Sequence, residues 1–203
     1  MSITLYELHP TRSARARWTL LELGVPFESI AGPEVFAMPE LAKIHPLSKL
    51  PALRDAGRPL FESAAICNWL ADSHPQAGLI APSGTWERAL HDQWVAFTLS
   101  EIEAFIWHTA RNLFVLPEAE RVPAIYPQNE AAARRGLAVL DAHLQDREWL
   151  VADRFSLTDI FTGYAVCWAQ WQGMTADLPN VTTYVARLQA RPLCTYQQDA
   201  PER

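Results

Sequence analysis

The chain has 203 residues, of which 49% are hydrophobic and 20% are charged, a composition typical of folded globular proteins and not of disordered ones. The formal net charge is -6 without long runs of like charge, so we expect neither nucleic acid nor a membrane as a partner. The three cysteines are scattered, the histidines show no metal-ligand spacing, and the N-terminus has no signal-peptide pattern, which predicts a metal-free cytoplasmic protein.

The first 80 residues predict a small α/β domain. Apolar stretches of strand length alternate with helical periodicity, and Gly24 is placed to end the first helix. This order is thioredoxin-like and predicts a mixed sheet with helices on both faces. The expected elements are strands at Ile3 to Leu5 and Phe27 to Ile30, helices at Ser13 to Leu23, Pro39 to Ile44 and Ser63 to Ser73, and a hairpin that turns at residues 55–59.

A segment rich in proline and glycine, residues 74–84, predicts an interdomain linker. From residue 86 to 203 the pattern is helical, which predicts a second, all-α domain. Ser156 and Asp159 have the layout of a capping box, and the apolar stretch after them predicts a buried central helix. The expected helices are Trp86 to Phe114, Asn129 to Leu144, one that begins at Ser156, and Pro179 to Arg191.

Two motifs in the first domain are specific. Residues 45–53 read H-P-L-S-K-L-P-A-L, and residues 61–70 read F-E-S-A-A-I-C-N-W-L. With the opening strand and the helix after it, they resemble the glutathione-binding half of cytosolic-type bacterial glutathione S-transferases, with mild departures at His45, Ser48, Leu50 and Trp69. The resemblance covers essentially the whole chain. It implies the glutathione transferase fold, an α/β thioredoxin-like N-terminal domain plus an all-α helical C-terminal domain.

The resemblance also implies how glutathione, the co-substrate, is held. Leu50 would pair its main chain with the cysteinyl part, as in strand addition. Glu62 and Ser63 would hold the γ-glutamyl amine and carboxylate, because a helix N-terminus exposes amides that suit an anion. Arg12 or Arg15 would assist Lys49 with the carboxylates, unless these cations are solvated surface groups. The implied glutathione-binding residues are Lys49, Leu50, Pro51, Glu62 and Ser63.

Three hydroxyls could lower the pKa of the glutathione thiol: Tyr6 at the end of the first strand, Thr11 in the next loop, and Ser13 at the helix start. The motif around residues 9–15 is more similar to the serine-using classes, which places Thr11 and Ser13 ahead of Tyr6. Taken alone, Ser13 is better explained as a helix cap and Tyr6 as a core aromatic. No cysteine occurs before Cys67, which disfavours the relatives that react through mixed disulfides.

The resemblance predicts a transferase that conjugates glutathione to a small apolar electrophile, a reaction of the detoxification type. A noncatalytic binding or regulatory protein, or a glutathione-dependent isomerase or dehalogenase, is the alternative. We expect a homodimer, with an apolar surface around Trp94 and Phe97. The electrophile pocket is expected between the domains, with Trp107, His108, Arg111 and Trp168 available to line it; taken alone, the two tryptophans are better explained as core residues.

Overall fold

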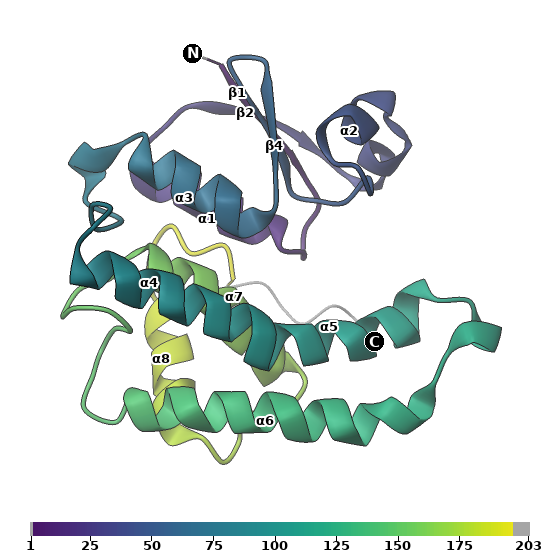
Figure 1. Ribbon diagram of the computed structural model, residues 1–203, viewed down its shortest axis with the longest axis vertical. Helices are drawn as coiled ribbons and strands as arrows, with labels where there is room; N and C mark the ends of the chain where they lie inside the picture. Colours follow the sequence, from purple (N-terminus) through teal and green to yellow (C-terminus); the bar gives the residue numbers. More distant parts are fainter. Residues whose placement is uncertain (1, 197–203) are drawn as a thin grey trace. The chain divides into compact units, whose positions relative to one another are not determined.

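The computed structural model describes residues 2–196 (Figure 1). The described residues form two compact units, one of residues 2–88 and 189–196 and the other of residues 89–188. The expected linker, residues 74–84, lies inside the first unit, where it includes a 3-10 turn, η2 (Pro75–Ala77). The boundaries 1–80 and 86–203 therefore differ from these units chiefly in the residues after α8, which pack with the first unit.

The first unit is built on a four-stranded sheet in the order β2-β1-β3-β4. The first pair, β1 (Ile3–Glu7) and β2 (Phe27–Ala31), is parallel, and β3 (Ala52–Asp55) is antiparallel to both β1 and β4 (Arg58–Phe61). The sheet is therefore mixed, as predicted. Pro59 lies in the edge strand β4, where its missing N–H does not interrupt a central ladder.

Helices cover both faces of this sheet (Figure 1). On one face α1 (Ser13–Leu23) packs beside α3 (Ser63–Asp72); on the other lie η1 (Pro33–Ala37) and α2 (Pro39–Ile44). Side chains alternate along β1, so Leu5 faces the pair of helices and Tyr6 joins the core of the α2 side. The predicted helices begin at the expected residues, and the left-handed Gly24 caps α1.

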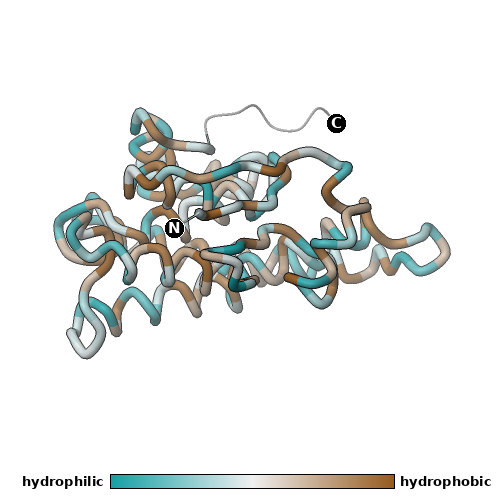
Figure 2. Tube along the Cα trace, turned by 90° about the horizontal axis from the view of Figure 1, so that it is seen from above, coloured by the Kyte–Doolittle hydropathy of each residue, from teal (hydrophilic) through white to brown (hydrophobic). Residues whose placement is uncertain are grey.

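The second unit consists of helices. A long helical stretch is formed by α4 (Trp86–Phe97), the π-helical η3 (Thr98–Glu103), α5 (Ala104–Ala110) and the π-helical η4 (Arg111–Val115). It contacts α6 (Tyr126–His143), which follows the short η5 (Glu118–Glu120) and η6 (Pro123–Ile125). The sequence predicted this stretch as one helix and did not predict its two π-helical segments. Hydrophobic and hydrophilic residues alternate in short blocks along the described part of the chain (Figure 2).

The central helix α7 (Leu157–Trp171) is buried along most of its length, as predicted, and α8 (Pro179–Gln189) follows it. Ser156 and Asp159 form the predicted capping box. The Asp159 carboxylate accepts hydrogen bonds from the Ser156 amide at 2.8 Å, the Leu150 amide at 3.0 Å and the Tyr184 hydroxyl at 2.9 Å. This buried carboxylate thus joins the start of α7 to α8 and to the preceding loop.

The expectation of an exposed apolar surface at Trp94 was wrong. Trp94 is 7% exposed, its ring lies 4.5 Å from that of His143, and Phe97 packs on it at 5.5 Å. The tryptophan is therefore part of the core that joins α4 to α6. No helix among residues 2–196 is both long and apolar enough to cross a membrane.

Candidate functional site

The glutathione-binding motifs converge where α3 begins and where the chain enters β3. Glu62 occupies the cap position of α3 with a φ of 69°, an uncommon value for a residue with a side chain. Ser63 is the buried first residue of the helix. The first intrahelical bond runs from the Ile66 amide to the Glu62 carbonyl, so the amides of the first turn are available to an anion.

Residues 49–51 lead into this corner. The Leu50-Pro51 peptide bond is cis, and both residues precede the ladder, which begins with Ala52 opposite Tyr6. The main chain of Leu50 therefore lies outside the strand pairing, and its side chain packs against the core on the α2 side. Lys49 is exposed. This arrangement leaves the Leu50 backbone in a position suited to pairing with an extended peptide.

His45 is a site residue whose role the sequence did not reveal. Its Nδ1 accepts a hydrogen bond from the Leu47 amide at 3.1 Å, and its ring packs 4.8 Å from Phe61. Burial lowers the pKa of His45, with Glu62 raising it and Lys49 lowering it. The neutral ring thus holds the turn before Leu50 against the strand before α3. Its place in the motif, where the family has asparagine, was the available signal.

The two hydroxyls before and at the start of α1 contact each other. Thr11 Oγ1 lies 2.5 Å from the Leu8 carbonyl oxygen and 2.9 Å from Ser13 Oγ. The Leu8 amide donates to Ser13 Oγ at 3.3 Å, and the Ser13 amide donates to Thr11 Oγ1 at 3.2 Å. Thr11 has one hydroxyl proton, so when it donates to Leu8 the Ser13 hydroxyl can donate to Thr11.

Burial separates these hydroxyls. Ser13 is 0% exposed, whereas Thr11 is half-buried, so Thr11 is the one that a ligand can reach. Arg12, not Ser13, occupies the cap position of α1, so the interpretation of Ser13 as a cap was wrong. Tyr6 lies in the core on the opposite, α2 side of the sheet. The geometry therefore favours Thr11 as the hydroxyl nearest to solvent at the start of α1.

Arg15 differs from both roles considered for it. It is 0% exposed in the interior of α1, so it is neither a solvated surface cation nor within reach of a carboxylate in solvent. Burial raises the pKa of the nearby Cys67 thiol to about 11, and the charge of Arg15 opposes this increase. Arg12 is half-buried and remains accessible.

A buried ion pair lies next to Leu8 and was not predicted from the sequence. The Glu7 carboxylate, 5% exposed, accepts hydrogen bonds from Arg17 through Nε at 2.8 Å and also through Nη2, and from Ser29 Oγ at 2.5 Å. Desolvation and the Arg17 charge lower the pKa of the neighbouring His9, opposed by Glu7. The cluster fixes the end of β1, from which the Thr11 loop departs. A glutamate that ends an apolar strand was its signal.

The four expected electrophile-pocket residues lie on three elements of the second unit. Trp107 and His108 are on α5, Arg111 begins η4, and Trp168 is near the end of α7. Both tryptophans are half-buried, and His108 and Arg111 are exposed. The tryptophans are thus neither core residues nor free surface groups, and their role as a pocket stays a prediction. No cluster of three or more His, Cys, Asp and Glu side chains suited to a metal occurs within residues 2–196.

Two family models match the chain: the glutathione S-transferase N-terminal domain over residues 11–73 and the C-terminal domain over residues 102–192. The chain is 31% identical to glutathione S-transferase F10 of Arabidopsis thaliana, covering 82% of each chain. It is 29% identical to glutathione S-transferase GST-4.5 of Xanthomonas campestris, covering 85% of this chain and 82% of the relative. It is also 30% identical to elongation factor 1-gamma 1 of Oryza sativa, but there it covers only 35% of the relative's length.

Solved structures agree with this similarity. A glutathione S-transferase of Methylobacterium radiotolerans in complex with glutathione sulfonate has a TM-score of 0.81 at 28% identity, covering 100% of this chain and 99% of that one. A theta class glutathione S-transferase of Xanthomonas axonopodis with glutathione bound has a TM-score of 0.79 at 29% identity, with 99% and 98% covered. The fold of this chain therefore occurs in glutathione S-transferases solved with glutathione or glutathione sulfonate bound.

Proposed function

Because this chain belongs to the glutathione S-transferase family, we propose that it activates the glutathione thiol for conjugation with, or addition to, a small apolar electrophile. The observation that carries the proposal is the pairing, in one unit, of an α3 N-terminus with open amides and the half-buried Thr11 hydroxyl before α1. The first feature suits a carboxylate, and the second suits a thiolate. A tripeptide thiol supplies both groups.

The γ-glutamyl carboxylate would accept hydrogen bonds from the amides of the first turn of α3 and from the Ser63 hydroxyl. Glu62 would hold the γ-glutamyl amine through its carboxylate. The main chain of Leu50, next to Pro51, would pair with the cysteinyl residue, and Lys49, assisted by Arg12, would hold the glycyl carboxylate. These contacts would orient the thiol without lowering its pKa, because they involve the rest of the tripeptide.

Thr11 would lower the thiol pKa. A free thiol has a pKa of about 8.5, so a decrease of ~2 units, equivalent to ~2.7 kcal/mol, would make the thiolate dominant at neutral pH. The Thr11 hydroxyl would exchange the Leu8 carbonyl for the sulfur as its acceptor. With the Thr11 proton directed at the sulfur, Thr11 Oγ1 would accept a hydrogen bond from the Ser13 hydroxyl 2.9 Å away, and this contact supports the assignment because it would strengthen Thr11 as a donor.

A second candidate function is a noncatalytic glutathione-fold protein, which the similarity to elongation factor 1-gamma favours. A glutathione-dependent isomerase or dehalogenase would use the same thiolate on another substrate. The ultraviolet absorbance of the thiolate separates these functions: either enzyme should develop it at neutral pH when glutathione is added. Turnover of aryl halides, epoxides, enones and peroxides would then identify the electrophile class, with Trp107, His108, Arg111 and Trp168 as the residues to vary. Absence of thiolate absorbance together with tight glutathione binding would support the noncatalytic function.

We also propose a homodimer and a cytoplasmic location. The dimer rests on family membership, because Trp94 no longer supplies an exposed surface for it; light scattering that gives 22.8 kDa, the monomer mass, at micromolar concentration would contradict it. The location is supported by Cys67, Cys167 and Cys194, all described, all buried and none in a disulfide, as expected in a reducing compartment.

A further inference from the structure

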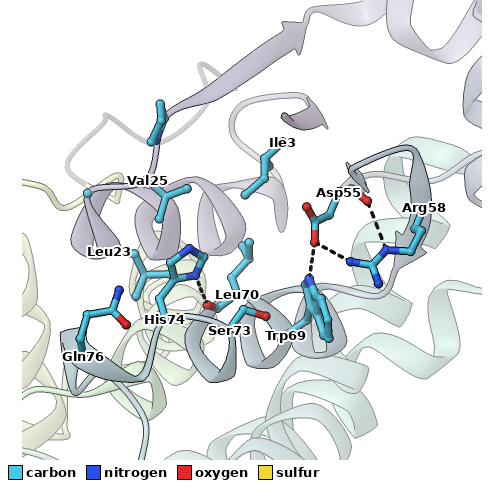
Figure 3. A pocket seen from close by; sticks show the side chains of 12 residues that line it. Ile3, Leu23, Val25, Asp55, Arg58, Trp69, Leu70, Ser73, His74 and Gln76 are labelled. Carbon is cyan, nitrogen blue, oxygen red and sulfur yellow. Dashed lines mark hydrogen bonds and ion pairs between the residues drawn. The ribbon is translucent and has the colours of Figure 1, made fainter. Parts of the chain in front are cut away.

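The first unit has a cavity of about 690 Å³ at the end of its sheet where β1 begins and the β3–β4 hairpin turns (Figure 3). This volume is within the range of small-molecule sites, about 300 to 1,000 Å³. The wall is formed by the start of β1, the segment after α1, the hairpin, and the end of α3 with the residues that follow it. The lining includes the side chains of Ile3, Leu23, Val25, Asp55, Leu70 and His74.

This cavity is separate from the glutathione motifs. The motifs lie at the first residues of α1 and α3, whereas the cavity contacts Leu23, at the end of α1, and Trp69 to Gln76, at the end of α3. An 11-residue helix is ~16 Å long. On the sheet, Ile3 pairs with Asp55 at the cavity end and Tyr6 pairs with Ala52 at the motif end. Two ligands could therefore be bound at once.

Asp55 provides the chemical character of the cavity. Asp55 is only 9% exposed, and its Oδ2 accepts hydrogen bonds from Trp69 Nε1 at 3.1 Å and from Arg58 Nη2 at 3.2 Å. Figure 3 shows Oδ1 on the other side of the carboxylate, turned toward Ile3 and away from these two donors. Neither Trp69 nor Arg58 contacts Oδ1. A carboxylate oxygen in so buried a wall favours a charged donor.

Two further polar side chains of the lining, His74 and Arg58, have partners within the chain. His74 Nδ1 lies 2.8 Å from the Leu70 carbonyl oxygen, so Nδ1 carries the proton of this hydrogen bond. Arg58, the cation of the lining, is directed to Oδ2 and stacks over the Trp69 ring at 5.3 Å. An anionic ligand would face the Asp55 charge without a free cation in the lining. The cavity therefore favours a positively charged ligand that donates a hydrogen bond.

We propose that this cavity binds a small primary amine with an apolar body. The ammonium group donates to Asp55 Oδ1, and the apolar body packs against Ile3, Leu23, Val25 and Leu70. The apolar lining stabilises the body by burial, and the carboxylate forms an ion pair with the ammonium group that neither a neutral alcohol nor a carboxylate ligand of the same shape can reproduce. A ligand of about nine non-hydrogen atoms fits this class, and its dissociation constant is expected to be on the order of 1 mM or lower.

Three probes of one shape test the proposal on the full chain: 2-phenylethylamine, 2-phenylethanol and phenylacetate. In calorimetry at low salt the amine should bind, the alcohol should bind at least about fivefold more weakly, and phenylacetate should give no measurable heat. The indole N–H signal of Trp69, identified with Trp69→Phe, should shift in ¹⁵N NMR as the amine is added. Saturating glutathione should change the amine affinity less than about twofold.

Variants identify the residue responsible. Asp55→Asn keeps an acceptor for Trp69 and should weaken the amine by about tenfold or more. The matched control is Glu40→Gln, an exposed carboxylate in the first turn of α2, on the other face of the sheet, and it should bind as wild type does. Ser73→Phe, at the exposed rim, should obstruct the cavity and abolish binding if Asp55→Asn fails to fold. Equal binding of the amine and phenylacetate, unchanged affinity in both Asp55→Asn and Ser73→Phe, or no binding at 20 mM amine would overturn the proposal.

Discussion

Arg191 forms a two-pronged ion pair with Glu22, 169 positions earlier in the chain, through Nε at 3.2 Å and Nη2 at 3.0 Å. Glu22 also accepts a hydrogen bond from Trp18 Nε1 at 2.9 Å. The Trp18 ring in turn meets the ring of Tyr196 edge-on at 4.8 Å. The segment after α8 therefore packs along α1, the helix that begins at Ser13 and follows the Thr11 loop.

We expect this segment to stabilise the first unit. Tyr196 is 1% exposed, so Tyr196→Ala should lower the free energy of unfolding by roughly 3 kcal/mol, the scale of deleting a buried aromatic ring. Urea denaturation would measure it. Leu193→Ala, in the same segment but 41% exposed, is the control and should change stability by less than ~1 kcal/mol. If both variants had equally small effects, the segment after α8 would not contribute to the stability of the first unit.

The role proposed for Thr11 predicts a specific kinetic change. Thr11→Ala should raise the pKa of bound glutathione by about 1 to 2 units and lower turnover by about 10- to 100-fold, because one donor to the developing anion is lost. Glutathione affinity should stay nearly constant. Thiolate absorbance against pH and steady-state kinetics measure both effects.

Three further variants separate the candidate hydroxyls. Thr11→Ser retains the donor and should keep most of the activity. Tyr6→Phe should leave the thiol pKa unchanged, since Tyr6 lies on the α2 side of the sheet. Ser13→Ala should have an intermediate effect, because Ser13 reaches the sulfur only through Thr11. Loss of thiolate absorbance in Tyr6→Phe alone would assign the site to the tyrosine type.

Ser63 offers a direct measure of glutathione binding. Ser63→Ala should reduce affinity about tenfold in calorimetry, the scale of one charge-assisted hydrogen bond of ~1.5 kcal/mol. Ser73→Ala, just after the other end of α3, is a matched control and should bind glutathione normally. An unchanged affinity in Ser63→Ala would remove the γ-glutamyl carboxylate from the start of α3.

Much of the first unit could be predicted because local signals coincide with the fold. The α1 boundaries follow from a helical stripe and from Gly24, whose φ of 65° a glycine adopts without strain. The burial of Arg15 could not be predicted in this way. It arises because α1 is covered both by α3 and by the segment that contains Tyr196, which lies nearly the whole chain away.

The second unit shows a different limit. A hydrophobic period near 3.6 residues identifies helix but does not register the extra residue of a π-helical turn, so η3 was invisible in the sequence. Trp94 suggested a surface because its partner, His143, comes from another helix. The sequence also could not choose between Thr11 and Ser13 as the thiol-activating residue. Burial distinguishes them, because Ser13 is buried and Thr11 is only half-buried.

Asp159 predicts a pH dependence of stability. Burial raises the pKa of this carboxyl to about 6 from 3.8, against the opposing effect of its hydrogen bonds. Between pH 4 and 6 the folded state therefore holds a proton that the unfolded state has lost. This group's contribution to the free energy of unfolding is largest below pH 4 and falls by an amount on the order of 3 kcal/mol as the pH rises through 6.

Comparison with Asp159→Asn isolates this contribution, because the asparagine does not titrate. The free energy of unfolding of wild type minus that of the variant should be larger at pH 4.5 than at pH 7.5. Urea denaturation at both pH values measures it. A difference that is independent of pH would mean that Asp159 titrates alike in both states.

Gly136 marks the closest approach of α6 to the π-helical segment η3. A Cβ atom placed on Gly136 would lie 2.5 Å from the Glu101 carbonyl oxygen and 2.7 Å from Ile102 Cγ1. Because the first of these neighbours is backbone, it cannot move aside without shifting η3 against α6.

Gly136→Ala should therefore destabilise the protein by roughly 1 to 3 kcal/mol, the scale of overpacking, despite the better helix propensity of alanine. The control is Val139→Ala on the same helix, where the side chain is 48% exposed and the change should be small. Urea denaturation of the two variants measures both effects, and a Gly136→Ala protein as stable as wild type would mean that α6 and η3 can separate without loss.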